Sequence, residues 1–125
     1  MIESDLINDI LEISIEGEKY EDQLQNQIEL LTIKEEEHTG TGLFVYFEHQ
    51  DGIEKFRIPS SGKNLDVEGK PTERIEKAEL INEHINVQAD TCVHLTNGLI
   101  DCVEIWNKPG PYPKGELVTY RLKPW

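Results

Sequence analysis

Two cysteines and a histidine in the second half of the chain are the residues best suited to chemistry. Cys92, His94 and Cys102 lie in two segments that alternate like β-strands and are joined through Thr96-Asn97-Gly98. Thiolate and imidazole groups are good ligands for zinc. Structural zinc sites usually show paired ligands at short spacings such as C-x₂-C, which this chain lacks. We therefore assign no metal and no cofactor, and keep a metal-binding or enzymatic use of this strand face as the alternative.

The register of this hairpin decides which side chains share a face. A two-residue loop at Asn97-Gly98 would pair Val93 with Cys102. A three-residue loop with a bulge at Gly98 would instead pair Cys92 with Cys102. The second register gathers the apolar side chains on one face and leaves only Asp101 out of place, so we predict it. It puts the following residues together on the other face: Cys92, His94, Cys102, Glu104 and Trp106. We expect reduced thiols in a cytosolic protein, with a cross-strand disulfide as the alternative.

Other patterns that could suggest catalysis have simpler explanations. Glu35-Glu36-Glu37-His38 has acid–base side chains, but consecutive residues of a strand point to alternate faces and cannot converge. Thr39-Gly40-Thr41-Gly42 lacks the Lys and the Ser or Thr of a phosphate-binding loop. No serine lies in a nucleophile-elbow pattern. We predict a solvated charge run, a turn, and a protein that is not an enzyme.

Negative charge is concentrated in the first half of the chain. Residues 1–60 hold fifteen Asp and Glu against four Lys and Arg, residues 61–125 hold ten against eight, and the net charge is −13. Such a field repels nucleic acid and anionic membranes and attracts a basic protein surface. We therefore expect a basic protein partner, no nucleic acid and no membrane. The basic residues Lys114, Arg121 and Lys123 either lie against the acidic half or form the second pole of a dipolar surface.

The spacing of apolar residues predicts a single acidic α+β domain over residues 1–125. Ser4 can cap a first short helix with an apolar stripe from Leu6 to Leu11, and a second helical segment starts near Tyr20. The remainder predicts a mainly antiparallel sheet of about five or six strands. The expected strands cover 28–37, 43–48, 53–58, 91–95, 99–106 and 117–122, residues 85–89 also alternate as a strand would, and 59–72 and 108–115 are expected loops. Residues 74–81 fit either a helix or a strand.

The first residues of the chain do not resemble a targeting signal. They lack the basic and apolar regions of a signal peptide. No apolar run approaches the roughly 18 residues that a membrane span requires. We expect a cytoplasmic protein.

Two segments resemble small bacterial proteins of uncharacterised activity. Residues 37–47, which contain Thr39-Gly40-Thr41-Gly42, are similar to the TGxGhhxxF start of a strand in those proteins. Residues 92–106, with Tyr112-Pro113 behind them, are similar to their C-terminal LxxGxhxxLEhh…P hairpin. Some of these proteins are immunity partners in bacterial polymorphic-toxin and contact-dependent growth inhibition systems. The resemblance supplies no catalytic residues.

This resemblance implies a non-enzymatic immunity protein that neutralises a cognate toxin. A toxin nuclease has a basic cleft that a rigid acidic surface can occupy, and charge complementarity raises the association rate. An exposed strand edge is a second mode of binding. The expected partner-binding residues are Glu35, Glu36, Glu37, Glu48, Asp51, Glu54, Trp106 and Tyr112. For the aromatic residues, including Trp125, packing at the edge of the core is the alternative.

Overall fold

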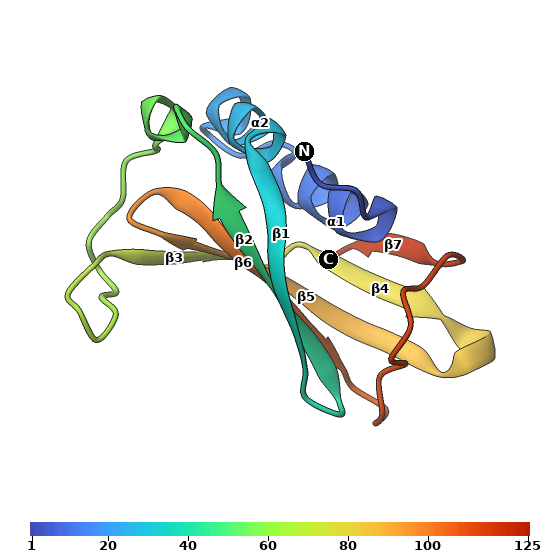
Figure 1. Ribbon diagram of the computed structural model, residues 1–125. Coiled ribbons are helices and arrows are strands. Elements are labelled where there is room, and N and C mark those ends of the chain that lie inside the picture. Colours follow the sequence, from blue (N-terminus) through green and yellow to red (C-terminus); the bar gives the residue numbers. More distant parts are fainter.

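The computed structural model describes residues 1–125 and contains two helices and a seven-stranded antiparallel sheet (Figure 1). The α+β class with N-terminal helices is confirmed. The helices are α1 (Asp5–Ile15) and α2 (Glu21–Glu29). The strands are β1 (Leu31–His38), β2 (Gly42–His49), β3 (Thr72–Ile75), β4 (Ala78–Asn82), β5 (Val87–Thr96), β6 (Leu99–Asn107) and β7 (Arg121–Pro124). Their order is β1-β2-β6-β5-β4-β7, and β3 pairs with the half of β5 that β4 leaves free.

Both helices lie over one face of the sheet (Figure 1). The predicted cap of α1 is present, since the Ile7 backbone N–H donates to Ser4 Oγ at 3.2 Å. The apolar stripe of α1 and the buried residues Leu24 and Ile28 of α2 join a core cluster of 25 buried residues between helices and sheet. No helix covers the second face, which we call the open face. Its central side chains are Phe44, Tyr46, Cys92, His94, Cys102 and Glu104.

The β5–β6 hairpin has a different turn from the predicted one, although its faces are as expected. Asn97 and Gly98 both have positive φ, at 54° and 78°, which is typical of a two-residue type I′ turn. The predicted bulge at Gly98 is therefore wrong. The bulge lies instead at Asp101, because Leu95 pairs with Ile100 while His94 pairs with Cys102. A bulge contains one unpaired residue and restores the alternation of side chains beyond it. The unpaired residue here is Asp101, which is also the one residue that did not fit the predicted apolar face.

The predicted strand over 53–58 is wrong. Residues Ile53–Phe56 form a short 3₁₀ helix, η1, and the buried side chain of Ile53 packs into the core. A returning strand has no place there, since both edges of β2 are already occupied by β1 and β6. The chain leaves the sheet after His49, turns at Gly52, whose φ of 91° suits glycine, and enters η1, which contacts α2.

Four further segments refine the sequence prediction. The ambiguous stretch 74–81 is mainly strand, formed by the end of β3 and the start of β4. The first predicted strand begins only at Leu31, because α2 extends to Glu29. The predicted strand over 117–122 is displaced, since regular pairing with β4 starts at Arg121. Residues 83–85 form a second short 3₁₀ helix, η2 (Glu83–Ile85), so only 87–89 of the alternating segment 85–89 pairs, as the start of β5.

The side chain of Gln27 joins three elements that are far apart in sequence. Its Nε2 donates to the carbonyl oxygens of Phe56 at 2.9 Å and Gly98 at 3.0 Å. Its Oε1 accepts from the Ile100 backbone N–H at 2.8 Å. Gln27 is fully buried, with 0% of its surface exposed. It therefore ties α2 to η1 and to the β5–β6 turn, and it is a partner for the buried Ile100 N–H, while the Gly98 carbonyl also accepts from the Ile58 N–H.

We expect Gln27→Met to lower the free energy of unfolding by about 2–4 kcal/mol, because it leaves buried backbone groups unpaired while keeping the side-chain length. Urea denaturation measures the change. Gln23→Met, at an exposed position of the same helix, is the control and should alter stability by less than about 0.5 kcal/mol. Equal stability of the two variants would contradict the assigned role of Gln27.

Candidate functional site

The negative charge of the first half is left almost without ion pairs. Of its fifteen carboxylates, only Glu18 pairs with a basic side chain, that of Lys77. Other ion pairs of the second half lie within that half. Lys108 pairs with Glu79 and Asp90, and Arg121 pairs with Glu83. The basic end packs beside α1 through β7, but Lys114, Arg121 and Lys123 form no ion pair with the acidic half. The charge of residues 1–60 stays available on the surface.

The predicted acidic residues of β1 do not form one surface. Glu35 pairs with Tyr46 and therefore points to the open face, as does Glu37 beside Phe44. Glu36 lies opposite Val45, on the face that carries the helices. All three side chains are exposed. The expected split of this charge run between two faces is confirmed, and the run cannot converge on one reacting group.

The other predicted contact residues lie in different parts of the molecule. Glu48 is exposed near the end of β2, and Asp51 and Glu54 are exposed in the turn and η1 that follow. Trp106 is 49% exposed on β6. Tyr112 is only 6% exposed and packs in the core cluster. Burial raises the pKa of Tyr112 to about 12.

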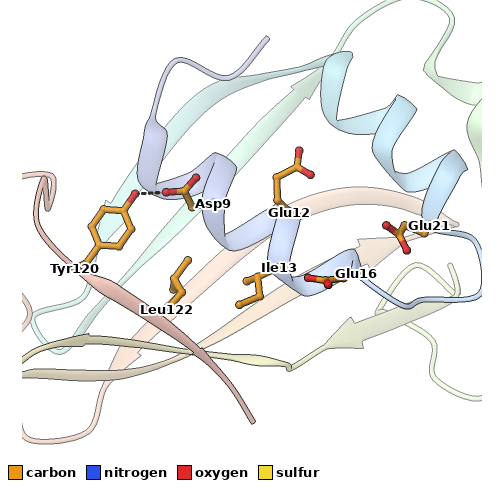
Figure 2. Close-up of a pocket in the computed structure, with 7 residues that line it drawn as sticks. All are labelled: Asp9, Glu12, Ile13, Glu16, Glu21, Tyr120 and Leu122. Carbon is orange, nitrogen blue, oxygen red and sulfur yellow. Dashed lines mark hydrogen bonds between the residues drawn. The ribbon is translucent and has the colours of Figure 1, made fainter.

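An acidic groove runs between α1, the start of α2 and β7 (Figure 2). Its floor contains Ile13 and Leu122, which lie side by side, and its volume is about 680 Å³. The groove is also lined by four carboxylates, of which that of Glu12 points away from Ile13 and Leu122 (Figure 2). We call it the α1–β7 groove, lined by Asp9, Glu12, Ile13, Glu16, Glu21, Tyr120 and Leu122.

Neutral donors hold several of these carboxylates in place. The Tyr120 hydroxyl donates to Asp9 Oδ2 at 2.5 Å, and Gln25 Nε2 donates to Glu12 Oε1 at 3.0 Å. The Gly17 backbone N–H donates to Glu21 Oε1 at 2.9 Å. These contacts orient the carboxylates without neutralising their charge. Burial, together with the hydrogen bond and the charge of Asp9, raises the pKa of Tyr120.

The sequence contains a signal for this groove that the prediction did not use. Asp5, Asp9, Glu12 and Glu16 follow one another at spacings of four, three and four residues, which places them on one side of a helix. The contribution of Tyr120 and Leu122 has no local signal, because β7 reaches the groove only through its pairing with β4.

A second cluster lies on the open face and is built by β5 and β6. Donor atoms of Cys92, His94 and Glu104 all lie within 4.8 Å of one another. Cys102 is not part of the cluster, although the predicted alternative included it. Both cysteines are free, and the hairpin places His94 rather than Cys92 opposite Cys102. Burial raises the pKa of Cys102 to about 12 and also raises that of Cys92, against a hydrogen bond from Arg74.

Comparisons with protein-family models, with curated proteins and with solved structures found no match to this chain. Neither helix of the fold has the length and apolar character needed to cross a membrane.

We expect Tyr120→Phe to lower the free energy of unfolding by about 1 kcal/mol, since it removes the bond between β7 and α1 at a partly exposed site. The pKa of Tyr120 is raised in the folded state. The hydrogen bond from Tyr120 therefore contributes fully to the free energy of unfolding below the ordinary phenol pKa of about 10, and this contribution is lost as the pH rises further. Urea denaturation at pH 7 measures the loss. Tyr20→Phe is the control, and an equal loss in both variants would contradict this contact.

We also expect native Cys102 to resist alkylation. With a pKa of about 12, only about one thiol in 10⁴ is ionised at pH 8, and the thiolate is the reactive form. Mass spectrometry after iodoacetamide treatment should find Cys102 modified more than about 100-fold more slowly in the folded protein than in urea. Equal rates in the two states would show that the thiol is neither buried nor perturbed.

Proposed function

We propose that this chain is a non-enzymatic, cytoplasmic binding protein of the bacterial immunity type, which neutralises a basic toxin domain by occupying its cleft. The observation that carries the proposal is the unpaired negative charge of residues 1–60, part of which surrounds the α1–β7 groove. The resemblance of residues 37–47 and 92–106 to small bacterial immunity proteins supports the same class.

The charge on α1 opposes the stability of the free protein. Like charges four residues apart on a helix repel each other, and Asp5 with Asp9 and Glu12 with Glu16 form two such pairs. The last turn of α1 has no basic residue, and Glu16 caps its C-terminal end, where the helix dipole disfavours negative charge. A basic partner would relieve both effects on binding. Residues that weaken a fold are commonly retained for function.

The shape of the α1–β7 groove suits lysine and arginine side chains. Their aliphatic stems can pack on Ile13 and Leu122, while their charged ends reach the surrounding carboxylates. Arginine can also bind a carboxylate through two parallel hydrogen bonds. Of the predicted contacts on β1, Glu36 lies on this side of the sheet, where it lines a small cavity with Ser4 and Ile7 at the start of α1.

A nuclease toxin is the partner class that this chemistry favours. Its active cleft must be basic, because phosphate neutralisation dominates the binding of nucleic acids. A row of carboxylates on a rigid helix can take the place of the phosphates and block the cleft. Such complexes associate rapidly through charge steering and weaken as salt screens the charges.

We predict a basic partner protein encoded beside this one, and we expect the double variant Glu12→Lys/Glu16→Lys to bind that partner at least about 10-fold more weakly, since charge reversal turns attraction into repulsion. Calorimetry at about 50 mM and about 500 mM salt measures the affinity, which should fall with salt for the wild-type protein.

Two matched variants show whether position or net charge is responsible. Glu29→Lys/Glu68→Lys makes the same change in net charge outside the groove and should retain most of the affinity. Glu35→Lys/Glu37→Lys changes the open face instead. If only the last variant loses binding, the partner contacts the open face. If no variant weakens binding, the acidic surface is not the binding site.

A further inference from the structure

Two strands bring a mixed set of metal-ligating groups together on the open face, on the other side of the sheet from α1. Cys92 and His94 are two residues apart on β5 and point to the same face, and Glu104 is the direct partner of Cys92 on β6. His94 Nε2 lies 2.9 Å from Glu104 Oε1. Every pair of donor atoms in the set lies within 4.8 Å.

These separations are close to those of a tetrahedral zinc site. Zinc bonds of about 2.0–2.3 Å place neighbouring ligand atoms roughly 3.3–3.7 Å apart. The set therefore requires side-chain movements of about 1 Å or less, with no change in the strands. Strands are rigid supports, which favours the precise positioning that a metal site needs.

The charges around the cluster would balance when a divalent cation binds. A cysteine thiolate and the Glu104 carboxylate together offset two positive charges. Next to them, Arg74 is already neutralised by Glu76, with 2.7 Å between Arg74 Nη2 and Glu76 Oε1. Arg74 Nε also donates to Cys92 Sγ at 3.4 Å. Without a cation, Glu104 has only the histidine as its partner.

The surroundings leave room for one further ligand. A small cavity of about 160 Å³ adjoins Cys92 and Glu104, and Trp106 and Trp125 form part of its wall. Trp106 and Trp125 are 49% and 62% exposed. Three protein ligands beside an accessible fourth position are typical of zinc sites that exchange a bound water or ligand.

We propose that Cys92 Sγ, His94 Nε2 and Glu104 bind one Zn²⁺ ion on the open face, with a fourth position facing the cavity beside Trp106 and Trp125. Cys102 takes no part in this site, although it is a neighbour on the same face. Because the site lies on the other side of the sheet from the α1–β7 groove, it is independent of the proposed binding of a basic partner.

The direct test is titration of the full chain, reduced with a phosphine, with Co²⁺ and then with Zn²⁺. We expect one Co²⁺ per chain, a thiolate-to-cobalt absorption band in the near ultraviolet, and loss of both the band and the visible absorption when Zn²⁺ displaces cobalt. Calorimetry with Zn²⁺ gives the affinity. Absence of the thiolate band, or binding of cobalt only to sites without sulfur, overturns the proposal.

The two cysteines supply a matched pair of variants. Cys92→Ser should abolish the thiolate band and weaken zinc binding by more than about 100-fold, whereas Cys102→Ser should leave both within about threefold of wild type. Glu104→Gln, which keeps the size of the side chain, should retain the band but weaken zinc binding. It serves as the second test if Cys92→Ser does not fold, as judged by circular dichroism. A band that survives Cys92→Ser, or that depends on Cys102, overturns the assignment.

Discussion

The hydrogen bonds of the Gln27 side chain are the constraint on which the arrangement of the two layers depends. One amide satisfies backbone groups of η1 and of the β5–β6 turn, so that α2 is fixed over one end of the sheet. Gly98 is required at this point, because a Cβ there would lie 2.2 Å from the carbonyl oxygen of Ile58. With α2 held in place, the chain can enter β1 at the sheet edge and leave β2 through η1.

This arrangement gives the two faces of the sheet different chemistry. The helix-bearing side presents the unpaired carboxylates of α1 around an apolar floor. The open face presents thiol, imidazole and carboxylate groups among aromatic side chains. Among the basic residues of the second half, only Lys77 forms an ion pair with a carboxylate of residues 1–60, and others pair within their own half, such as Lys108 with Glu79. Two separate proposals follow, one for each side of the sheet.

Local patterns predicted much of the fold because they depend on near neighbours. The cap at Ser4, the helical stripe of α1 and the alternation of β5 and β6 follow from short-range spacing. The 53–58 segment could not be predicted in this way, since its conformation depends on β6 occupying the free edge of β2. For the candidate sites, the shared face of Cys92, His94 and Glu104 followed from alternation. The groove could not be predicted from local spacing, because it depends on the contact of Tyr120, just before β7, with Asp9 of α1.

The central claim, that a basic partner binds the acidic side of the molecule, is tested most directly by mapping the contact in solution. ¹⁵N-labelled protein is titrated with the basic toxin domain, and the backbone amide signals are followed by NMR. The account predicts that the largest changes fall on residues 9–16 of α1 and 120–122 beside them, and that added salt reverses them. Changes confined to β5, β6 and the open side of β2, or changes that salt does not affect, would contradict it.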